Sequence, residues 1–398
     1  SFGDTNTQNF DSGSVRVLGS VNGFSTNNNT GVVRIQNVRL SLAGDSLWTG
    51  TTAAPVILSG PLGSGTITFG PGGSDGSNDR MGSVGSAGQN LTIMNALELT
   101  GSSAAFATGF NYTFEGRGSL NFLRTGYNIP VGDTDSGTQN ARPRFFNVTT
   151  QQGTVRIDGN IDRQTNGSGN GSLLVKRGSG ILEINGNTTG GVYTALTFQG
   201  TSWRLDAGNL VVRTDANLGG IIGTRQSMVN LNGGTLSVNG TFQTDHQYVL
   251  AAASTINVTQ GNVFTLRGLD QATTTTQALT GAFGLTKTGL GEFRMNPVTI
   301  GAAPAATGVS ANTSLTIGGF NPWVSASATV DNRLNAVTSS NVSGSPFAAA
   351  NAPITIAGGL LGLTGTAAQT ITQTASLTPA GGGYVSIARP TTGTNALT

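Results

Sequence analysis

One short pattern of apolar residues, lysine and glycine occurs twice in this chain and limits what it can fold into. The first copy spans Leu173–Gly191 and the second spans Leu285–Met295. In each copy, an apolar run that contains a lysine is followed by Gly-x-Gly and then by alternating apolar residues. A repeat of short strands and glycines indicates an array of stacked units, because one such unit cannot bury a core alone.

The rest of the chain also consists of short apolar runs separated by turn-forming residues. Short runs rich in Val, Ile, Leu, Thr and Phe alternate with Gly, Asn, Asp or Ser, and no window has a helical period. Residues at the centres of corresponding apolar runs, such as Glu183, Val211, Ser237 and Asn257, lie roughly 20 to 28 residues apart. This spacing fits one coil of two or three strands. The strands expected from these runs are Ser14–Leu18, Val32–Leu42, Pro55–Leu58, Thr66–Phe69, Asn90–Leu99, Tyr112–Phe114, Ser119–Leu123, Val155–Asp158, Leu173–Val175, Ile181–Ile184, Trp203–Leu205, Leu210–Arg213, Thr235–Val238, Thr255–Val258, Val263–Leu266, Ser314–Ile317, Ile354–Ile356, Leu360–Thr364, Thr370–Thr372 and Tyr384–Ile387.

These observations predict an all-β chain that forms a right-handed parallel β-helix. Stacked parallel strands lie about 4.8 Å apart, inward Leu, Ile, Val and Phe fill a narrow core, and Gly and Asn form the corners. The alternative is a string of β-sandwiches, because Asn185–Gly186 and Asn239–Gly240 are also typical of hairpin turns. We expect one continuous solenoid over residues 1–398, which is loop-rich over residues 1–150, has its clearest repeat over residues 151–300 and is Ala/Thr-rich over residues 301–398. Within the loop-rich region, Gly70–Gly88 and Thr125–Arg144 are expected to be loops.

The repeat resembles the autotransporter-associated β-strand repeat, also called the passenger-associated transport repeat. The residues that match the family pattern are Leu174, Lys176, Gly178, Gly180, Leu182, Ile184, Gly186, Gly190–Gly191, Ala207–Leu210 and Ala216–Gly219 in the first copy, and Leu285, Lys287, Gly289, Gly291, Phe293 and Met295 in the second. The chain departs from the pattern at Tyr193, which follows the glycine pair, and at Pro297. The resemblance covers Leu173–Met295 and implies a secreted or surface-displayed β-helix of a bacterium with an outer membrane.

Composition excludes several classes of function. Charged residues make up 10% of the chain and the net charge is +2, which gives no strong field for nucleic acid or an anionic membrane. The chain has no cysteine, so disulfides and cysteine-based sites are absent. No apolar stretch approaches the roughly 20 residues that span a bilayer. The start at Ser1, without Met or a signal-like segment, is expected to be a processed N-terminus.

Few residues qualify for catalysis, and we predict that the chain is not an enzyme and has no cofactor. His246 is the single histidine and is expected at a corner or on the surface. Gly72–Gly76 matches Gly-x-Ser-x-Gly but lacks the strand–turn–helix context of a nucleophile. The best carboxylate pair is Asp158 and Asp162, which are flanked by Arg156 and Arg163 and could stack under Glu183. We expect these charges to form surface ion pairs, with a polysaccharide-active site as the remote alternative.

Other candidates concern calcium, sugars and loop charges. Asp75–Asp79 and Asp133–Asp135 resemble calcium loops without a complete ligand set. Trp48, Trp203 and Trp323 could stack on sugars, although packing is the commoner role of a lone tryptophan. Arg142, Arg144 and Lys176–Arg177 are the densest basic pairs and are expected to be solvated. Lys287 repeats Lys176, for which we expect an outward position at a coil edge. Eleven Asn-x-Ser/Thr sequons occur, including those at Asn90, Asn111, Asn147 and Asn257.

Two functions from different classes follow from these features. The first is a structural, extracellular β-rod that self-associates, because no polar capping helix is evident and open solenoid ends expose strand edges. Ser1–Phe10 or Thr391–Thr398 could bridge to a second copy by strand addition. The second is a surface adhesin that binds a cell-surface glycan through Gly70–Gly88 and Thr125–Arg144.

Overall fold

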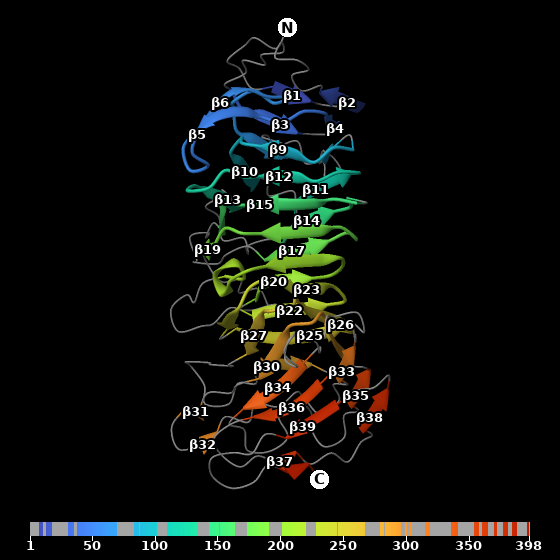
Figure 1. Cartoon of the computed structure of the whole chain (residues 1–398). Helices are drawn as coiled ribbons and strands as arrows, with labels where there is room; N and C mark the ends of the chain where they lie inside the picture. The colour runs from blue at the N-terminus through green and yellow to red at the C-terminus, as the bar shows by residue number, and fades with distance from the viewer. Residues whose placement is uncertain are drawn as a thin grey trace. The chain divides into compact units, whose positions relative to one another are not determined.

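In the computed structural model, the described residues form mainly short β-strands, with a single 3-10 turn among them (Figure 1). The residues that it describes are 8–10, 13–17, 31–35, 38–69, 83–86, 88–101, 110–133, 143–150, 152–163, 173–190, 201–219, 228–244, 246–266, 279–281, 283–295, 299–300, 303–304, 315–318, 336–340, 354–357, 360–364, 370–371, 377–380, 384–387 and 396–397. The chain divides into two compact units, which are described separately: unit 1 is residues 1–210 with 216–220, and unit 2 is residues 211–215 with 221–398. That the whole chain forms one continuous solenoid stays a prediction.

Unit 1 is built from three parallel sheets, which the chain visits in turn. The first sheet is β2 (Gly13–Val17), β4 (Val38–Leu42), β8 (Ser83–Ser86), β11 (Phe110–Gly116), β14 (Arg144–Val148), β17 (Leu174–Arg177) and β20 (Thr201–Leu205). The second is β9 (Leu91–Ile93), β12 (Leu120–Phe122), β15 (Thr154–Ile157) and β18 (Ile181–Ile184). The third is β1 (Gln8–Phe10), β3 (Val33–Ile35), β7 (Ile67–Phe69), β10 (Leu97–Gly101), β13 (Asn128–Asp133), β16 (Asn160–Arg163) and β19 (Thr188–Gly190). Strand β21 (Asn209–Val212) and the 3-10 turn η1 (Asp215–Asn217) contain the unit boundary.

Unit 2 repeats this three-sheet arrangement. Its first sheet contains β22 (Met228–Asn232), β25 (Gln247–Ala252) and β28 (Leu279–Gly281). Its second contains β23 (Thr235–Val238), β26 (Ser254–Val258), β29 (Leu285–Thr288), β33 (Leu315–Gly318), β35 (Ile354–Ala357) and β38 (Leu377–Ala380). Its third contains β24 (Phe242–Thr244), β27 (Val263–Leu266), β30 (Glu292–Met295), β34 (Ala336–Ser340), β36 (Leu360–Thr364) and β39 (Tyr384–Ile387). The short pairs β31 (Thr299–Ile300) with β32 (Ala303–Pro304), and β37 (Thr370–Ile371) with β40 (Ala396–Leu397), are separate.

The strand pairing confirms the predicted parallel β-helix, whose fullest coils contain three strands, one in each sheet. In the second sheet of unit 1, Asp158 and Asn185 occupy neighbouring coils 27 residues apart. In unit 2, Ser237 pairs with Asn257 20 residues later, as the sequence spacing predicted, and Asn257 pairs with Thr288 31 residues later. Coils therefore vary in length, while these strand pairs keep a continuous register.

The core of unit 1 consists of inward-facing ladders. Leu120, Val155 and Leu182 stack in the second sheet and are buried, while the alternate residues Asn121, Arg156 and Glu183 face outward. Each fully buried Leu, Ile or Val contributes roughly 1.5 to 3 kcal/mol of transfer free energy. Aromatic rings also pack in this core: Tyr112 and Phe146 of the first sheet meet edge to face (5.5 Å), Phe146 is tilted against Trp203 (5.7 Å), and Phe69 of the third sheet meets Phe114 edge to face (5.4 Å).

Some expected strands and loops are corrected by the structure. The run Val32–Leu42 forms two strands in different sheets, β3 and β4, and Asn90–Leu99 likewise forms β9 and β10. Both predicted loops contain a strand: β8 lies within Gly70–Gly88 and β13 within Thr125–Arg144. A glycine-rich strand is hard to see in sequence, yet β8 needs Gly85, because a Cβ there would lie 2.7 Å from the Glu115 carbonyl oxygen. The remainder of the two segments lies largely outside the described residues.

One antiparallel hairpin interrupts the solenoid pattern. Strands β5 (Leu47–Gly50) and β6 (Pro55–Ser59) occupy the stretch between β4 and β7, where the chain has no second-sheet strand. The residues before the hairpin cover the edge of β9: Thr92 N donates to Asp45 Oδ1 (2.6 Å), Met94 N donates to Ser46 Oγ (3.1 Å), and Ser46 N donates to Thr92 O (2.8 Å). The second sheet of unit 1 thus begins with a capped strand, which the sequence did not predict.

The close approach of coils at the corners can be tested with two glycines of unit 2. Gly261 (φ 79°) and Gly289 (φ 76°) have similar left-handed backbones, but a Cβ at Gly289 would lie 2.2 Å from Val258 O, whereas nothing lies within 4 Å of a Cβ at Gly261. We expect Gly261→Ala to cost about 1 kcal/mol and Gly289→Ala to cost more than about 3 kcal/mol. The measurement is urea unfolding followed by circular dichroism. Equal losses in the two variants would refute the steric account.

Candidate functional site

Both copies of the repeat place their lysine inside a coil. Lys176 and Lys287 are 0% exposed, so the expected outward position is wrong. In its ladder, Lys287 is the register partner of the buried Ile256, and Lys176 is the partner of the buried Phe146. The alkyl part of a lysine suits such a position, while its ammonium group requires polar partners.

The ammonium groups are surrounded by backbone carbonyls of the glycine corner. Lys176 Nζ donates to the carbonyl oxygens of Arg177 (2.7 Å), Gly178 (2.8 Å) and Ala207 (3.2 Å). Lys287 Nζ donates to those of Thr288 (2.9 Å), Gly289 (3.0 Å) and Gly291 (2.8 Å). Three acceptors match the three N–H bonds of an ammonium group. The lysine therefore satisfies carbonyls that the corner turns inward, and its recurrence is explained by backbone hydrogen bonding.

The two copies serve different corners of their coils. In unit 1, the first copy joins β17 of the first sheet to β18 of the second. In unit 2, the second copy joins β29 of the second sheet to β30 of the third. The sequence pattern therefore marks a type of corner, and its position in the coil is set by the surrounding strands.

The glycine corner after each buried lysine is hydrogen-bonded to an Asn-Val-Thr tripeptide of the preceding coil. Gly180 N donates to Val148 O (2.8 Å), and Gly291 N donates to Val258 O (2.9 Å). The asparagines of these tripeptides, Asn147 and Asn257, are the sequon residues named above. Asn257 Nδ2 donates to Ser237 Oγ (3.2 Å), so its amide takes part in a ladder between coils. The sequence contains a signal for this contact, because Asn-Val-Thr occurs one coil before each of the two lysines.

The buried lysines make stability depend on pH. Burial lowers the pKa of Lys176 and of Lys287 from 10.5 to about 7; for Lys287 the nearby Glu292 charge acts in the opposite direction. Between pH 7 and 10.5 the unfolded chain therefore binds more protons than the folded chain, so the free energy of unfolding rises with pH in this range, by up to about 1.4 kcal/mol per pH unit for each lysine.

We expect urea midpoints of the wild type to increase from pH 7 to pH 9.5. The double variant Lys176→Met/Lys287→Met should have a lower midpoint, because six acceptor contacts are lost, and a flatter pH dependence. If the variant retains the wild-type slope, these two lysines are not the groups that titrate.

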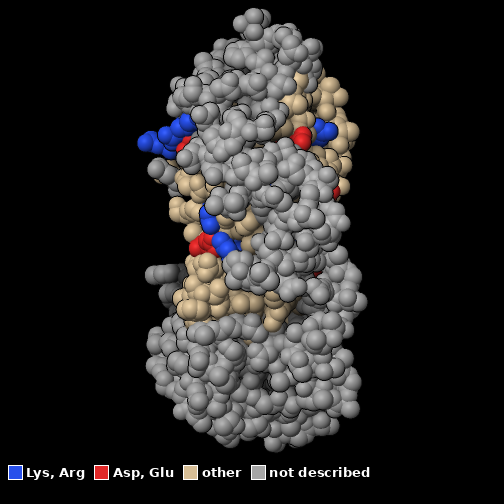
Figure 2. All heavy atoms as spheres, turned by 180° about the vertical axis from the view of Figure 1, so that it is seen from behind, with Lys and Arg blue, Asp and Glu red and all other residues tan. Residues whose placement is uncertain are grey.

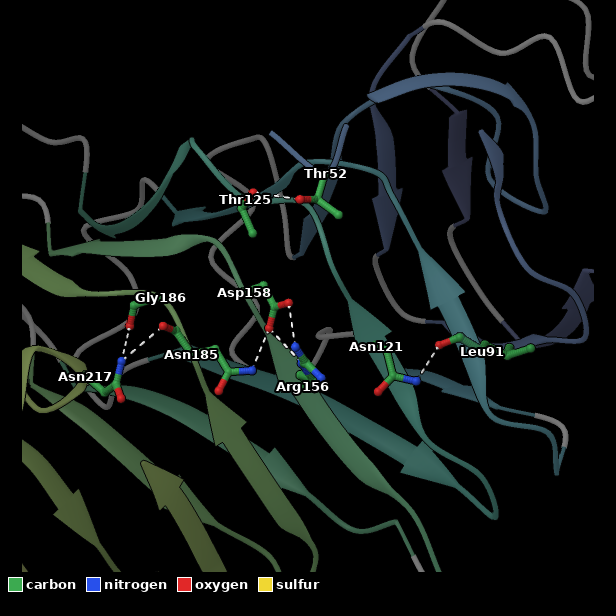
Figure 3. Close-up of polar contacts among 9 residues, drawn as sticks. All are labelled: Thr52, Leu91, Asn121, Thr125, Arg156, Asp158, Asn185, Gly186 and Asn217. Atoms are coloured by element: carbon green, nitrogen blue, oxygen red, sulfur yellow. Dashed lines mark hydrogen bonds and ion pairs between the residues drawn. The ribbon is translucent and has the colours of Figure 1, made fainter. Parts of the chain in front are cut away.

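The predicted carboxylate site does not assemble as an acidic cluster. Arg156 donates to Asp158 in a fork, Nε to Oδ1 (2.8 Å) and Nη2 to Oδ2 (2.9 Å), and Asn185 Nδ2 also donates to Asp158 Oδ1 (2.8 Å; Figure 3). The fork, with the Glu183 charge, raises the pKa of Arg156. Asp162, in the third sheet, accepts from Thr189 Oγ1 (3.4 Å). Among the described residues, no three His, Asp or Glu side chains gather to hold a metal ion.

Buried asparagines form further hydrogen bonds between neighbouring coils. Asn217 Nδ2 donates to Asn185 O (3.2 Å) and Gly186 O (2.8 Å), as Figure 3 shows, and Asn217 O accepts from Thr188 Oγ1 (2.7 Å). Asn95 does the same earlier in unit 1, where its Nδ2 donates to Gly63 O (3.0 Å) and Gly65 O (2.8 Å). These asparagines bind carbonyls of the adjacent coil, whereas the lysines bind mainly carbonyls of their own corner.

Forked ion pairs recur on the outer faces of the strands. Arg204 forks onto Asp206 (2.7 and 2.8 Å) in unit 1, and Arg294 forks onto Glu292 (3.0 and 2.9 Å) in unit 2. Arg177 also contacts Asp206 (3.2 Å). On the face drawn in Figure 2, the few charged atoms of the described residues lie in small mixed groups of both signs. The predicted ion pair is present for Asp158, although this carboxylate is largely buried, and the prediction is wrong for Arg163, which is buried.

Other predicted residues have different environments from those expected. Arg144, expected to be solvated, is buried in β14. His246 lies at the corner between β24 and β25, one of its two expected positions, and is buried there with Nε2 3.3 Å from Asp215 Oδ1 in unit 2. Trp203 is fully buried beside Phe146 and cannot stack on a sugar, which confirms its predicted packing role. The segments Gly72–Gly76 and Asp75–Asp79, and the residues Asp135, Arg142 and Trp323, lie outside the described residues.

Comparison of the chain with protein-family models, curated proteins and solved structures finds no match. The likeness to the autotransporter-associated repeat therefore stays a prediction. In the region of the chain that the structure describes, no helix is long and apolar enough to cross a membrane.

Arg163 is a buried charge at the end of β16. Its side chain is 0% exposed; Nε donates to Thr189 O (3.4 Å), while Nη1 and Nη2 have no hydrogen-bond partner among the described residues. Burial lowers its pKa from 12.5 to about 10, against the opposing effect of Asp162, so it remains charged at neutral pH. A buried charge without a paired carboxylate destabilises a folded chain.

Replacing this charge should stabilise the protein. We expect Arg163→Met to raise the free energy of unfolding by about 1 to 4 kcal/mol at pH 7. The control is Arg156→Met, which removes an arginine that has a carboxylate partner and is partly exposed, and which should lower stability or leave it unchanged. Thermal unfolding of both variants distinguishes the cases; destabilisation by Arg163→Met would mean that an anionic partner compensates this charge.

Proposed function

We propose that this chain is a structural β-solenoid of a bacterial cell surface that self-associates end to end. The observation that carries the proposal is that its polar side chains bind neighbouring coils. Lys176, Asp158 and Asn217 each contact main chain or side chains of another coil. Side chains used in this way build a stack, and a stack of parallel strands can continue into a second molecule if its terminal strands are open.

Terminal strands of both units have one neighbour each among the described residues. In unit 1, β1 pairs with β3 and β2 pairs with β4. In unit 2, β38 pairs with β35 and β39 pairs with β36. Residues 377–380 and 384–387 carry no charge that would oppose strand addition. The extracellular location rests on the resemblance of the repeat to secreted passengers.

Proline substitution in β39 tests end-to-end addition. Neighbouring residues of a parallel strand direct their N–H groups to opposite edges, so one of Val385→Pro and Ser386→Pro removes a bond to β36 and the other removes only an outward donor. We expect the wild type to form filaments in negative-stain electron microscopy. Of the two variants, the one that keeps wild-type thermal stability should lose them. Wild-type protein that stays monomeric at every concentration would refute the proposal.

An adhesin remains the second candidate because of where four strands of unit 1 end. The segments after Phe69, Gly101, Asp133 and Arg163 follow neighbouring strands of the third sheet of unit 1. Parallel strands end at the same edge of their sheet, so these four strand ends lie at one edge, and the segments that follow them in the sequence consist mostly of small and polar residues. A monomer that binds a cell-surface glycan, and loses binding when residues 134–140 are replaced, would favour this function.

A further inference from the structure

We propose that the β5–β6 hairpin is a dimerisation surface, on which strand β6 of one copy pairs antiparallel with β6 of a second copy. The hairpin presents Leu47, Val56 and Leu58 to solvent with exposed fractions of 55%, 59% and 53%. Among the described residues only Ile181 and Phe283 are comparable large exposed hydrophobics, and they belong to other elements. A cluster of apolar side chains on one projecting element is typical of an interaction site.

The hairpin is anchored at both of its ends. At its tip, Thr125 N donates to Thr52 O (2.9 Å), and the two threonine hydroxyls are 3.1 Å apart (Figure 3). At its base, Asp45 and Ser46 are bonded to β9 as described above. These bonds hold the apolar side chains in a fixed position, so a partner binds them without ordering the hairpin first.

The free edge of β6 provides main-chain groups for pairing. Within the described ranges of the chain, β6 pairs only with β5, and the two form a separate two-stranded sheet. An uncharged edge strand with apolar side chains readily adds another strand. Residues 46–60 contain no charged side chain, so two copies of the hairpin meet without repulsion.

The sequence of β6 is self-complementary about Ile57. If Ile57 faces Ile57 of the second copy, Val56 lies opposite the second copy's Leu58, and Leu58 lies opposite its Val56. Val56 and Leu58 share one face of the strand because side chains alternate. The pairing therefore joins the exposed apolar residues of both copies in one cross-strand cluster, an interaction that stabilises antiparallel sheets. A lipid surface would cover the same side chains but would leave the edge of β6 unpaired.

This contact is independent of the end-to-end assembly proposed above. It joins copies side by side through β6, whereas end-to-end addition requires terminal strands such as β39. Failure of one leaves the other open to its own test.

Cysteine cross-linking measures the register, because the chain has no cysteine of its own. We expect Ile57→Cys to form a disulfide-linked dimer under mild oxidation, since directly opposed residues of an antiparallel pair lie close enough to cross-link. The control is Ala54→Cys, an exposed position at the hairpin tip outside the pairing register. Equal cross-linking at both positions, or none at Ile57→Cys, overturns the proposal.

Analytical ultracentrifugation tests the apolar cluster, in Val385→Pro or Ser386→Pro protein if filaments interfere. We expect wild-type hairpins to dimerise, and Val56→Glu/Leu58→Glu to raise the dissociation constant at least tenfold, which corresponds to about 1.4 kcal/mol. Ala54→Glu adds a charge at the tip and should leave dimerisation unchanged. A monomeric wild type that floats with neutral phosphatidylcholine vesicles would instead identify a lipid surface as the partner and refute the dimer.

Discussion

The structure depends on how closely the backbone of one coil approaches the corner of the coil before it. At Gly178 and Gly289, a Cβ would lie 2.3 and 2.2 Å from a carbonyl oxygen of the preceding coil. Such contact allows parallel strands to stay in register across coils of different length. It also turns carbonyl groups toward the interior, where each must find a donor or cost free energy.

Buried polar side chains of the protein supply these donors. Lys176 and Lys287 each place one ammonium group among three carbonyls, and Asn95 and Asn217 each donate from a side-chain amide to two carbonyls. A lysine in a β-strand core is costly unless its donors are used. Arg163 shows the contrast, because its terminal nitrogens lack partners among the described residues. The burial of these lysines and asparagines is thus explained by the corner carbonyls to which they donate.

The use of polar side chains for contacts between coils also bears on function. Asp158 was the best catalytic candidate in the sequence, and the structure holds it between Arg156 and Asn185 of the next coil. Its oxygens link coils, which is consistent with a structural role for the stack. The hairpin region treats two strand edges differently, because Asp45 and Ser46 cover the edge of β9, while β6 pairs only with β5 among the described residues. Growth at one edge is blocked, and a different edge is offered to a partner.

The sequence by itself determined the fold class and the coil spacing, as the pairing of Ser237 with Asn257 demonstrates. It did so because strand and corner residues are local preferences that repeat with the coil. It could not place Lys176 inside, since a lysine in an alternating strand normally faces water. It also missed β8, whose Gly85 is explained only by contact with β11. The antiparallel hairpin was also decided by tertiary structure, because whether β6 stacks in a coil or projects from it depends on which edges its neighbours leave open.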